Sequence, residues 1–280
     1  MIAVIVINFG SPDLTVRFVR EECAKIRESH QVVVVDNAST GVSYDALRQA
    51  LPEAVVLRSP DNQGFARANN QGAEYALRHF RPSHFLFSNN DIYFQDAHVV
   101  DFLLDVMKSH PEAGLIGPQV VGTDGKRQSP NPRRTFADTY LLPTWGKWFL
   151  KKETLRKRVQ ADYRQNAQEG PCGWIQGSCF LADADVFERV GGFDPATFLY
   201  GEELILTERF ARAGKTVYFC PRVTVVHDQG AVTRTLYGSN QIRRMEFQSL
   251  AYYYRKYAGT PQWQVLLGRI ILEFNILRGK

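Results

Sequence analysis

The stretch FLFSNND, Phe85–Asp91, joins an apolar run to two asparagines and an aspartate. Aliphatic and aromatic residues at this density fill the interior of a sheet, so a strand ends where the polar residues begin. Asn, Asp and Ser also end strands for purely local reasons, because their side chains stabilise turns. In open α/β sheets, however, ligands bind outside the carboxyl ends of the strands. The stretch therefore fits either a turn or a binding site.

The first half of the chain alternates apolar strands with amphipathic helices. Val and Ile runs between such helices predict a mostly parallel sheet covered on both faces, an α/β fold of Rossmann-like type. Two strands end in polar residues, Asp36–Asn37 and Asn89–Asp91, which would face one crevice. The strands are expected at 2–9, 31–37, 54–59, 84–89 and 113–118, and the helices at 13–28, 43–51, 64–80 and 96–109.

The second half is less regular. Residues 122–170 are rich in Pro, Lys and Arg and indicate a mobile excursion rather than a second domain. Regular elements are expected again from residue 173, and the chain closes with two helices that extend the fold. We expect strands at 173–183, 215–219 and 223–227, and helices at 201–213, 239–257 and 262–277.

The charge of the chain is concentrated in one segment. The net charge is +5, and residues 145–160 hold six Lys or Arg and one Glu, which equals the whole surplus. A nucleic-acid groove would spread its cations over several elements, so we expect no nucleic-acid partner. The segment 145–158 also carries tryptophans, and 262–277 is amphipathic, so each is either packed or solvated, or lies on a membrane surface.

The four cysteines, the start of the chain and its hydropathy all favour the cytoplasm. The cysteines are widely spaced without a metal-ligand pattern, which indicates reduced core residues. The chain opens directly into an apolar strand, so we expect no signal peptide. No window of about 20 residues is apolar enough to span a bilayer. We expect a cytoplasmic protein, at most peripheral on the inner face of the plasma membrane.

Five stretches at predicted strand ends and loops together resemble a known family. In order, spacing and position they are similar to the inverting family 2 glycosyltransferases of the GT-A fold, in particular the bacterial, rhamnosyltransferase-like branch that builds surface polysaccharides such as O-antigen and cell-wall polymers. The stretches are VVDNAST (34–40), PDNQGFARANNQG (60–72), FSNND (87–91), GGFDPATFLYGEELILTERFARAG (191–214) and PRVTVVHDQG (221–230).

The resemblance implies a division of the chain. Residues 1–230 would form the GT-A domain, with a nucleotide-binding half at 1–118 and an acceptor and catalytic half at 119–230 that contains the mobile loop. Residues 231–280 would form a C-terminal helical extension.

The resemblance implies a nucleotide site. Asp36 corresponds to the aspartate that accepts a hydrogen bond from a pyrimidine N3–H, although an Asx cap on the following turn is the local alternative. Gly64 allows close backbone approach and opens a helix whose N-terminus favours anions. For Arg67 a surface salt bridge is the alternative. The expected nucleotide-binding residues are Asn8, Asp36, Asn37, Asn62, Gly64, Arg67, Asn70, Asn89 and Asn90.

The resemblance also answers what FLFSNND is for. NND stands where the family has its DxD-type motif, with Asn89 in the place of the first aspartate. Asp91 would then bind a divalent cation, Mn²⁺ or Mg²⁺, because carboxylate and phosphate oxygens suit these hard ions. His227 stands where the family has a histidine that completes the metal shell or contacts the diphosphate, while a structural histidine is the alternative.

The catalytic base departs from the family pattern. The family has Glu-Asp followed by an aspartate two positions on, whereas GEELIL places Glu203 at the aspartate and Ile205 at the later acid. Glu203 is the expected base and Glu202 the fallback. Both could instead be acids that complement the helix dipole. Trp174, Gly177 and Ser178 are expected to contact the sugar or acceptor, with strand packing as the alternative.

The expected function is transfer of a sugar from a UDP- or dTDP-linked donor, for example dTDP-rhamnose, to a hydroxyl of a growing, lipid-linked glycan. A catalytically silent relative that binds nucleotide or glycan is the first alternative, because of Glu203 and Ile205. A sugar nucleotidyltransferase is less favoured because NFGSPD (8–13) has no phosphate-binding cations. A nicotinamide dehydrogenase is less favoured still, because no GxGxxG follows the first strand.

Overall fold

The computed structural model describes residues 1–280 except 40, 147–150, 152, 155–162, 229–237 and 279–280. Nine strands form one sheet. They are β1 Ile2–Asn8, β2 His30–Asn37, β3 Val55–Ser59, β4 His84–Asn89, β5 Ile92–Phe94, β6 Ala113–Gly122, β7 Gly170–Pro171, β8 Cys179–Asp183 and β9 Thr216–His227.

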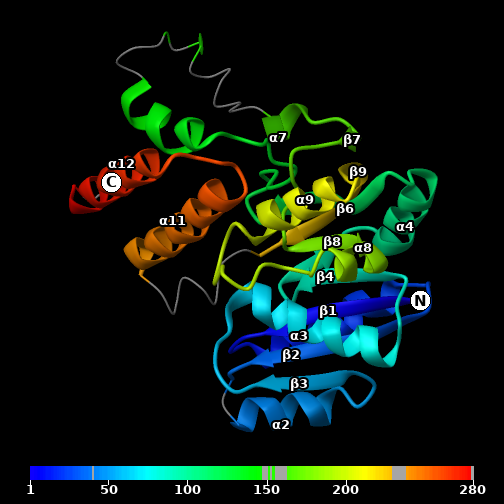
Figure 1. Cartoon of the computed structure of the whole chain (residues 1–280). Coiled ribbons are helices and arrows are strands. Elements are labelled where there is room, and N and C mark those ends of the chain that lie inside the picture. Colours follow the sequence, from blue (N-terminus) through cyan, green and yellow to red (C-terminus); the bar gives the residue numbers. More distant parts are fainter. Residues whose placement is uncertain (40, 147–150, 152, 155–162, 229–237, 279–280) are drawn as a thin grey trace.

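Helices cover both faces of this sheet and extend beyond it (Figure 1). The α-helices are α1 Pro12–Arg17, α2 Gly41–Ala50, α3 Gly64–His79, α4 Val99–Ser109, α7 Tyr163–Asn166, α8 Ala184–Arg189, α9 Glu202–Arg212, α11 Ser239–Lys256 and α12 Gln262–Leu277. The other helical elements are the π-helices η1 Phe18–Glu22 and η3 Ala137–Gly146 and the 3₁₀-helix η2 Cys23–Lys25. Each helix among the described residues is too short or too polar to cross a bilayer.

The sheet has the order β3-β2-β1-β4-β8-β6-β9-β5, and β7 pairs with β9. Strands β3, β2, β1, β4, β6 and β9 run in one direction, while β8, β5 and β7 run in the other. The prediction of an α/β fold with a mostly parallel sheet and C-terminal helices is therefore confirmed. Asn8 pairs with Asp36 and Ile7 with Asn89, so three neighbouring parallel strands end in polar residues at one edge.

The alternation of side chains along the strands divides the core between the two faces. Ile2, Val4 and Val6 pack with α4 and η1 on one face, while Ala3 and Ile5 pack with α3, α8 and α9 on the other. Both faces are covered, which is why the strands read as continuous apolar runs rather than as alternating ones.

Some predicted elements differ from the observed ones. The expected strand 173–183 begins at Cys179, and the expected strands 215–219 and 223–227 are the single strand β9. The register of β9 against β6 shifts between Pro118 and Gln119. Pro118 and Pro221 lack N–H donors, and a bulge accommodates the missing ladder bonds. The expected helix 13–28 is divided into α1, η1 and η2. That residues 122–170 form a mobile loop stays a prediction.

The C-terminal helices α11 and α12 pack on each other and on η3, beside the end of the sheet (Figure 1). Asp194, in the loop after α8, anchors α11: its Oδ2 accepts hydrogen bonds from Tyr252, Lys256 and Tyr257 at 2.9, 3.1 and 2.6 Å. Burial alone would raise the pKa of Asp194, but hydrogen bonds from Tyr257, the Ala196 N–H, Lys256 and Tyr252 hold it well below its usual range. The extension is thus joined to the body through a buried, ionised carboxylate.

Candidate active site

Asp36 lies at the carboxyl end of β2 and is fully buried. Its Oδ1 accepts a hydrogen bond of 2.8 Å from Asn8 Nδ2, and Asn8 Oδ1 accepts one of 2.8 Å from Thr15. These bonds fix the carboxylate, while its Oδ2 has no hydrogen-bond partner. A buried acceptor without a partner is costly, and a bound N–H donor would remove that cost. The geometry therefore suits a ligand N–H such as that of a pyrimidine base.

Asn37 and Asn62 form a polar pair next to Asp36. Asn37 Nδ2 donates to Asn62 Oδ1 at 2.9 Å, and Asn37 Oδ1 accepts from the Gln63 N–H at 2.9 Å. Asn62 Oδ1 also accepts from the Gly64 N–H at 3.0 Å. These bonds shape the turn that opens α3, so both side chains have an evident structural role. Their contact with a nucleotide stays a prediction.

Gly64, Arg67 and Asn70 face the loop that follows α8. Gly64 has a φ of +73°, and a Cβ there would lie 2.2 Å from the Phe198 carbonyl oxygen. Arg67 Nε donates to the Pro195 carbonyl at 2.9 Å, and the Asn70 side chain forms two bonds of 2.9 Å with the backbone of Phe193. The close approach at Gly64 is thus made by protein backbone. These residues fasten the loop to α3, and their binding of nucleotide stays a prediction.

Three side chains come together at this edge of the sheet: Asn89 at the end of β4, Asp91 in the turn between β4 and β5, and His227 at the end of β9. The Asp91 Oδ1 and His227 Nε2 atoms lie 3.4 Å apart, and Asn89 Nδ2 lies 3.3 Å from the same Nε2. His227 Nδ1 lies 2.8 Å from Gln128 Oε1, which can only accept, so Nδ1 donates this hydrogen bond. The other ring nitrogen, Nε2, faces Asp91. Asp91 Oδ1 is buried without a hydrogen-bond partner.

These two atoms fit a divalent cation, although they form an incomplete shell. A carboxylate oxygen and an imidazole nitrogen oriented by an outer hydrogen bond are suitable metal ligands. In the described part of the chain, no three His, Cys, Asp or Glu side chains gather closely enough to hold a metal. Asp91 and His227 would hold a cation at this position, and water and a bound diphosphate would be suitable sources of further ligands.

Asn90 points away from this pair and toward α1. Its Nδ2 donates to Thr15 Oγ1 at 2.8 Å. Arg17 donates to the carbonyls of Asn90 and Ile92 at 2.8 and 2.7 Å and forms an ion pair of 2.8 Å with the buried Glu22. Hydrogen bonds from α1, together with the ion pair to η1, therefore fix the backbone on both sides of Asp91. The sequence did not indicate this support.

Glu203 lies in the first turn of α9 against the loop that precedes β8. Its Oε1 accepts a hydrogen bond of 3.1 Å from the Gly177 N–H. A Cβ at Gly177 would lie 2.4 Å from this oxygen, so only glycine allows the contact. Burial raises the pKa of Glu203, while backbone hydrogen bonds oppose the rise. Glu203 is thus a weakly acidic, positioned carboxyl group, as a general base requires.

Glu202 and Ile205 differ from Glu203 in their surroundings. Glu202 is 3% exposed, its Oε2 has no hydrogen-bond partner, and burial followed by the charge of Glu203 raises its pKa well above the usual range. The pKa of Glu202 is thus raised further than that of Glu203, because its side chain is more deeply buried. Ile205 is fully buried in the core under α11, where an acid would be unfavourable.

A cavity of about 350 Å³ opens beside Glu203. Trp174 lines it and donates through Nε1 to the Pro132 carbonyl at 3.1 Å. Ser178 is buried, its Oγ has no hydrogen-bond partner, and its carbonyl accepts from the Asn89 N–H at 2.8 Å. The loop 174–178 thus connects the Glu203 cavity with the Asp91 pair. Other lining residues are Gln128, Asn131, Arg134, Arg164, Gln176, Tyr200, Glu246, Leu250 and Tyr254.

Sequence reasoning missed most of that lining. Glu246 and Tyr254 come from α11, so the C-terminal extension forms part of the cavity wall. Gln128, Arg134 and Arg164 come from the irregular region. Only Gln128 could have been anticipated, because a metal-binding histidine such as His227 needs a hydrogen-bond partner for its second ring nitrogen.

The predicted membrane segments differ in what is described. Most of 145–158 lies outside the described residues. In α12, five large apolar side chains are 51–85% exposed at a spacing of three or four residues, so this face does not pack on the body. They are Trp263, Leu266, Ile270, Phe274 and Leu277.

Comparison with known proteins identifies the family. The model of glycosyl transferase family 2 matches residues 3–191. N-acetylglucosaminyl-diphospho-decaprenol L-rhamnosyltransferase of Mycobacterium tuberculosis is 30% identical over 72% of this chain and 67% of its own length. The low-salt glycan biosynthesis hexosyltransferase Agl10 of Haloferax volcanii is 24% identical over 89% of this chain and 73% of its own.

Solved structures agree on the fold. The mannosyltransferase PcManGT of Pyrobaculum calidifontis, in complex with GDP-Man and Mn²⁺, has a TM-score of 0.60 at 15% identity and covers 100% of this chain and 76% of its own. GalNAc-T7 with UDP, GalNAc and Mn²⁺ has a TM-score of 0.57 at 14% identity, over 91% of this chain and 48% of its own. The chain belongs to glycosyl transferase family 2 and is a glycosyltransferase of the GT-A fold.

Proposed function

We propose that the protein transfers a sugar, with inversion, from a nucleotide diphosphate to a hydroxyl of a growing, lipid-linked cell-surface glycan. The observation that carries this proposal is Glu203, a carboxyl group with a raised pKa on the wall of a cavity. The loop 174–178 connects it to the Asp91 and His227 pair. The acceptor class is supported by the mycobacterial relative, whose name specifies a lipid diphosphate that carries a sugar.

Glu203 is proposed as the general base. Its carboxylate accepts the proton of the acceptor hydroxyl, which attacks the anomeric carbon from the side opposite the departing nucleotide diphosphate. A raised pKa makes the carboxylate a stronger base. Glu202 is the weaker candidate, because its side chain is buried and does not line the cavity.

The donor is proposed to be a UDP- or dTDP-sugar, with dTDP-rhamnose as the specific candidate; the mycobacterial relative's name supports rhamnose as the sugar. Asp36 Oδ2 is a free, buried acceptor for a pyrimidine N3–H. Asp91 and His227 are the residues that would hold Mn²⁺ or Mg²⁺, and the cation would neutralise charge on the leaving diphosphate. Two structural neighbours are complexed with Mn²⁺, which supports this cofactor class.

The proposed division of the chain follows the same roles. Residues 1–118 form the nucleotide-binding half, 119–230 the acceptor and catalytic half, and 231–280 the helical extension. The extension takes part in acceptor binding, since Glu246 and Tyr254 of α11 line the cavity of Glu203.

The exposed face of α12 is proposed to lie on an anionic membrane surface, on the cytoplasmic side. The exposed Arg269 and Arg278 flank the apolar stripe, and the one acid of the helix, Glu273, is paired with Arg244 at 2.6 Å. An amphipathic helix with an apolar stripe and basic flanks is typical of interfacial binding. This position would bring the cavity close to a lipid-linked acceptor.

The direct test is a transfer reaction with the purified protein. UDP- and dTDP-sugars are incubated with a short-chain sugar diphospholipid and Mn²⁺, Mg²⁺ or EDTA, and the product's anomeric configuration is read by NMR. We expect transfer from one pyrimidine donor, dependent on metal, with inverted configuration. Transfer with retention, or none from any donor, would contradict the proposal.

A further inference from the structure

Two arginines lie in the wall of the Glu203 cavity without an acidic partner. Arg134 has a buried Nε atom with no hydrogen-bond partner, and no ion pair to it occurs within the described ranges. Arg164 donates through Nε at 2.7 Å, and through Nη2, to the side-chain oxygen of Asn131, which is neutral. Neither guanidinium group therefore forms an ion pair with an acidic residue in the described part of the chain.

The two charges also act on each other. The pKa of Arg164 is lowered first by burial and then by the charge of Arg134. The carboxylates of the cavity do not relieve them: Glu203 is held by the Gly177 N–H, and the charge that acts on Glu246 is Arg243. Arg134 is half-buried and Arg164 is exposed, so an anion could reach both groups, and it would relieve the repulsion between them.

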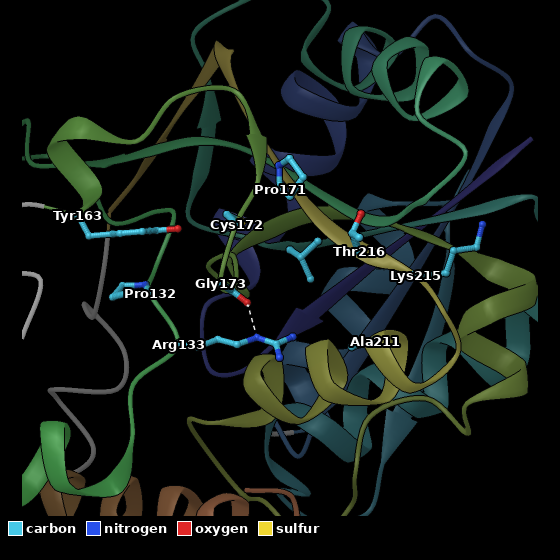
Figure 2. Close-up of a pocket in the computed structure, with 10 residues that line it drawn as sticks. Pro132, Arg133, Tyr163, Pro171, Cys172, Gly173, Ala211, Lys215 and Thr216 are labelled. Atoms are coloured by element: carbon cyan, nitrogen blue, oxygen red, sulfur yellow. Dashed lines mark hydrogen bonds between the residues drawn. The ribbon is translucent and has the colours of Figure 1, made fainter. Parts of the chain in front are cut away.

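Arg133 shows the contrast one residue earlier. It forms an ion pair of 3.0 Å with Glu208 and donates to the Gly173 carbonyl at 3.3 Å. Figure 2 shows its side chain in a different cavity, lined by Pro171, Cys172 and Thr216. Arg133 is thus compensated within the protein, whereas Arg134 is not. The difference points to a ligand at Arg134.

The position of the pair relative to the donor residues selects the ligand. Gln128 lies between the two sites: its Oε1 binds His227 Nδ1, and the same residue lines the cavity of Arg134 and Arg164. The donor diphosphate is assigned to the Asp91 and His227 side. The arginines face the cavity where the acceptor meets Glu203.

We propose that Arg134 and Arg164 bind a phosphate group of the acceptor, so that the protein selects a sugar linked through a diphosphate over the same sugar on a neutral lipid. This inference rests on the proposed function and adds the feature of the acceptor that is recognised. Guanidinium groups suit this role because they bind phosphate oxygens in a bidentate manner.

The test is a calorimetric titration without donor, so that its result does not depend on turnover. The probes are a short-chain alkyl N-acetylglucosaminyl diphosphate and the corresponding alkyl N-acetylglucosaminide without phosphate. Wild type should bind the diphosphate about tenfold to hundredfold more tightly, since hydrogen bonds to charged groups have this strength. The double variant R134Q/R164Q and the single variant R134Q should lose most of this preference, while R133Q should keep it.

Equal affinity of wild type for the two probes, or an unchanged preference in R134Q/R164Q, would overturn the inference. UDP and dTDP are titrated in parallel: a matching loss of nucleotide affinity in R134Q/R164Q would overturn the acceptor assignment and give the pair to the donor. Wild type that binds the diphosphate through these arginines but transfers no sugar would contradict the proposed function and leave this inference standing. Near-UV circular dichroism and the thermal midpoint establish that each variant is folded.

Discussion

Replacing Gly177 with alanine should displace the carboxylate of Glu203, the proposed base, and leave the proposed nucleotide site unchanged. The new Cβ would lie 2.4 Å from Glu203 Oε1, and the other two nearest atoms also belong to Glu203. Ordinary van der Waals contact begins at 3.4 Å, so the carboxylate oxygen must move by about 1 Å to restore it. A misplacement of about 1 Å at a reacting group lowers the rate by roughly 10²-fold. We therefore expect kcat to fall about a hundredfold.

The assay is release of nucleoside diphosphate from the donor at saturating acceptor, with donor affinity measured by calorimetry. Donor affinity and the thermal midpoint should stay near wild type, because a single side chain can absorb the shift. Gly238→Ala is the matched control, since its Cβ would meet nothing within 4 Å. A G177A variant with wild-type kcat would refute the assignment of Glu203 to this position.

Four further outcomes follow from named contacts. Asp36→Asn should weaken binding of UDP or dTDP about tenfold to hundredfold, measured by calorimetry, because it disrupts the charged acceptor of the base N–H. The pH profile of kcat/KM should show an acid limb above pH 4.5, since the raised pKa of Glu203 means that the active carboxylate is lost as pH falls through that raised value. Asp194→Asn should lower the free energy of unfolding by about 2 kcal/mol in denaturant titrations at neutral pH. The Asp194 pKa is depressed, so this contribution is present above the unfolded pKa of about 3.9 and disappears as pH falls through the lower folded value. The double variant I270E/F274E should lose flotation with anionic lipid vesicles while keeping turnover on a soluble acceptor, and equal flotation of both proteins would refute the membrane face.

The parallel half of the sheet was readable from the sequence because its strands are buried on both faces. The run Val32–Val35 and the polar Asp36 after it indicated a strand and the point near which it ends. Strand β9 was not readable as one strand, since Pro221 interrupts its pattern and the bulge opposite Pro118 is set by the neighbouring strand. Helix α12 was correct in extent, but only the fold decides which face remains exposed.

The site was predictable only where a residue follows a strand directly. Asp91 and His227 were expected as a pair, and they lie 3.4 Å apart. The contact between Gly177 and Glu203 joins a loop to a helix 26 residues away, and no local pattern encodes it. Gln128 and Arg134 come from an irregular segment that lacks periodicity, so their roles became visible only through their unpaired or shared atoms.

The central claim is that Glu203 is the base, and Glu203→Gln tests it most directly. The amide keeps the size of the side chain and removes its capacity to accept a proton. Turnover with the identified donor and acceptor should fall by roughly 10²- to 10⁴-fold, while the calorimetric affinity for the nucleoside diphosphate stays near wild type. Turnover within a few fold of wild type, in a variant that still binds nucleotide, would contradict the account and return the role to Glu202 or to another group.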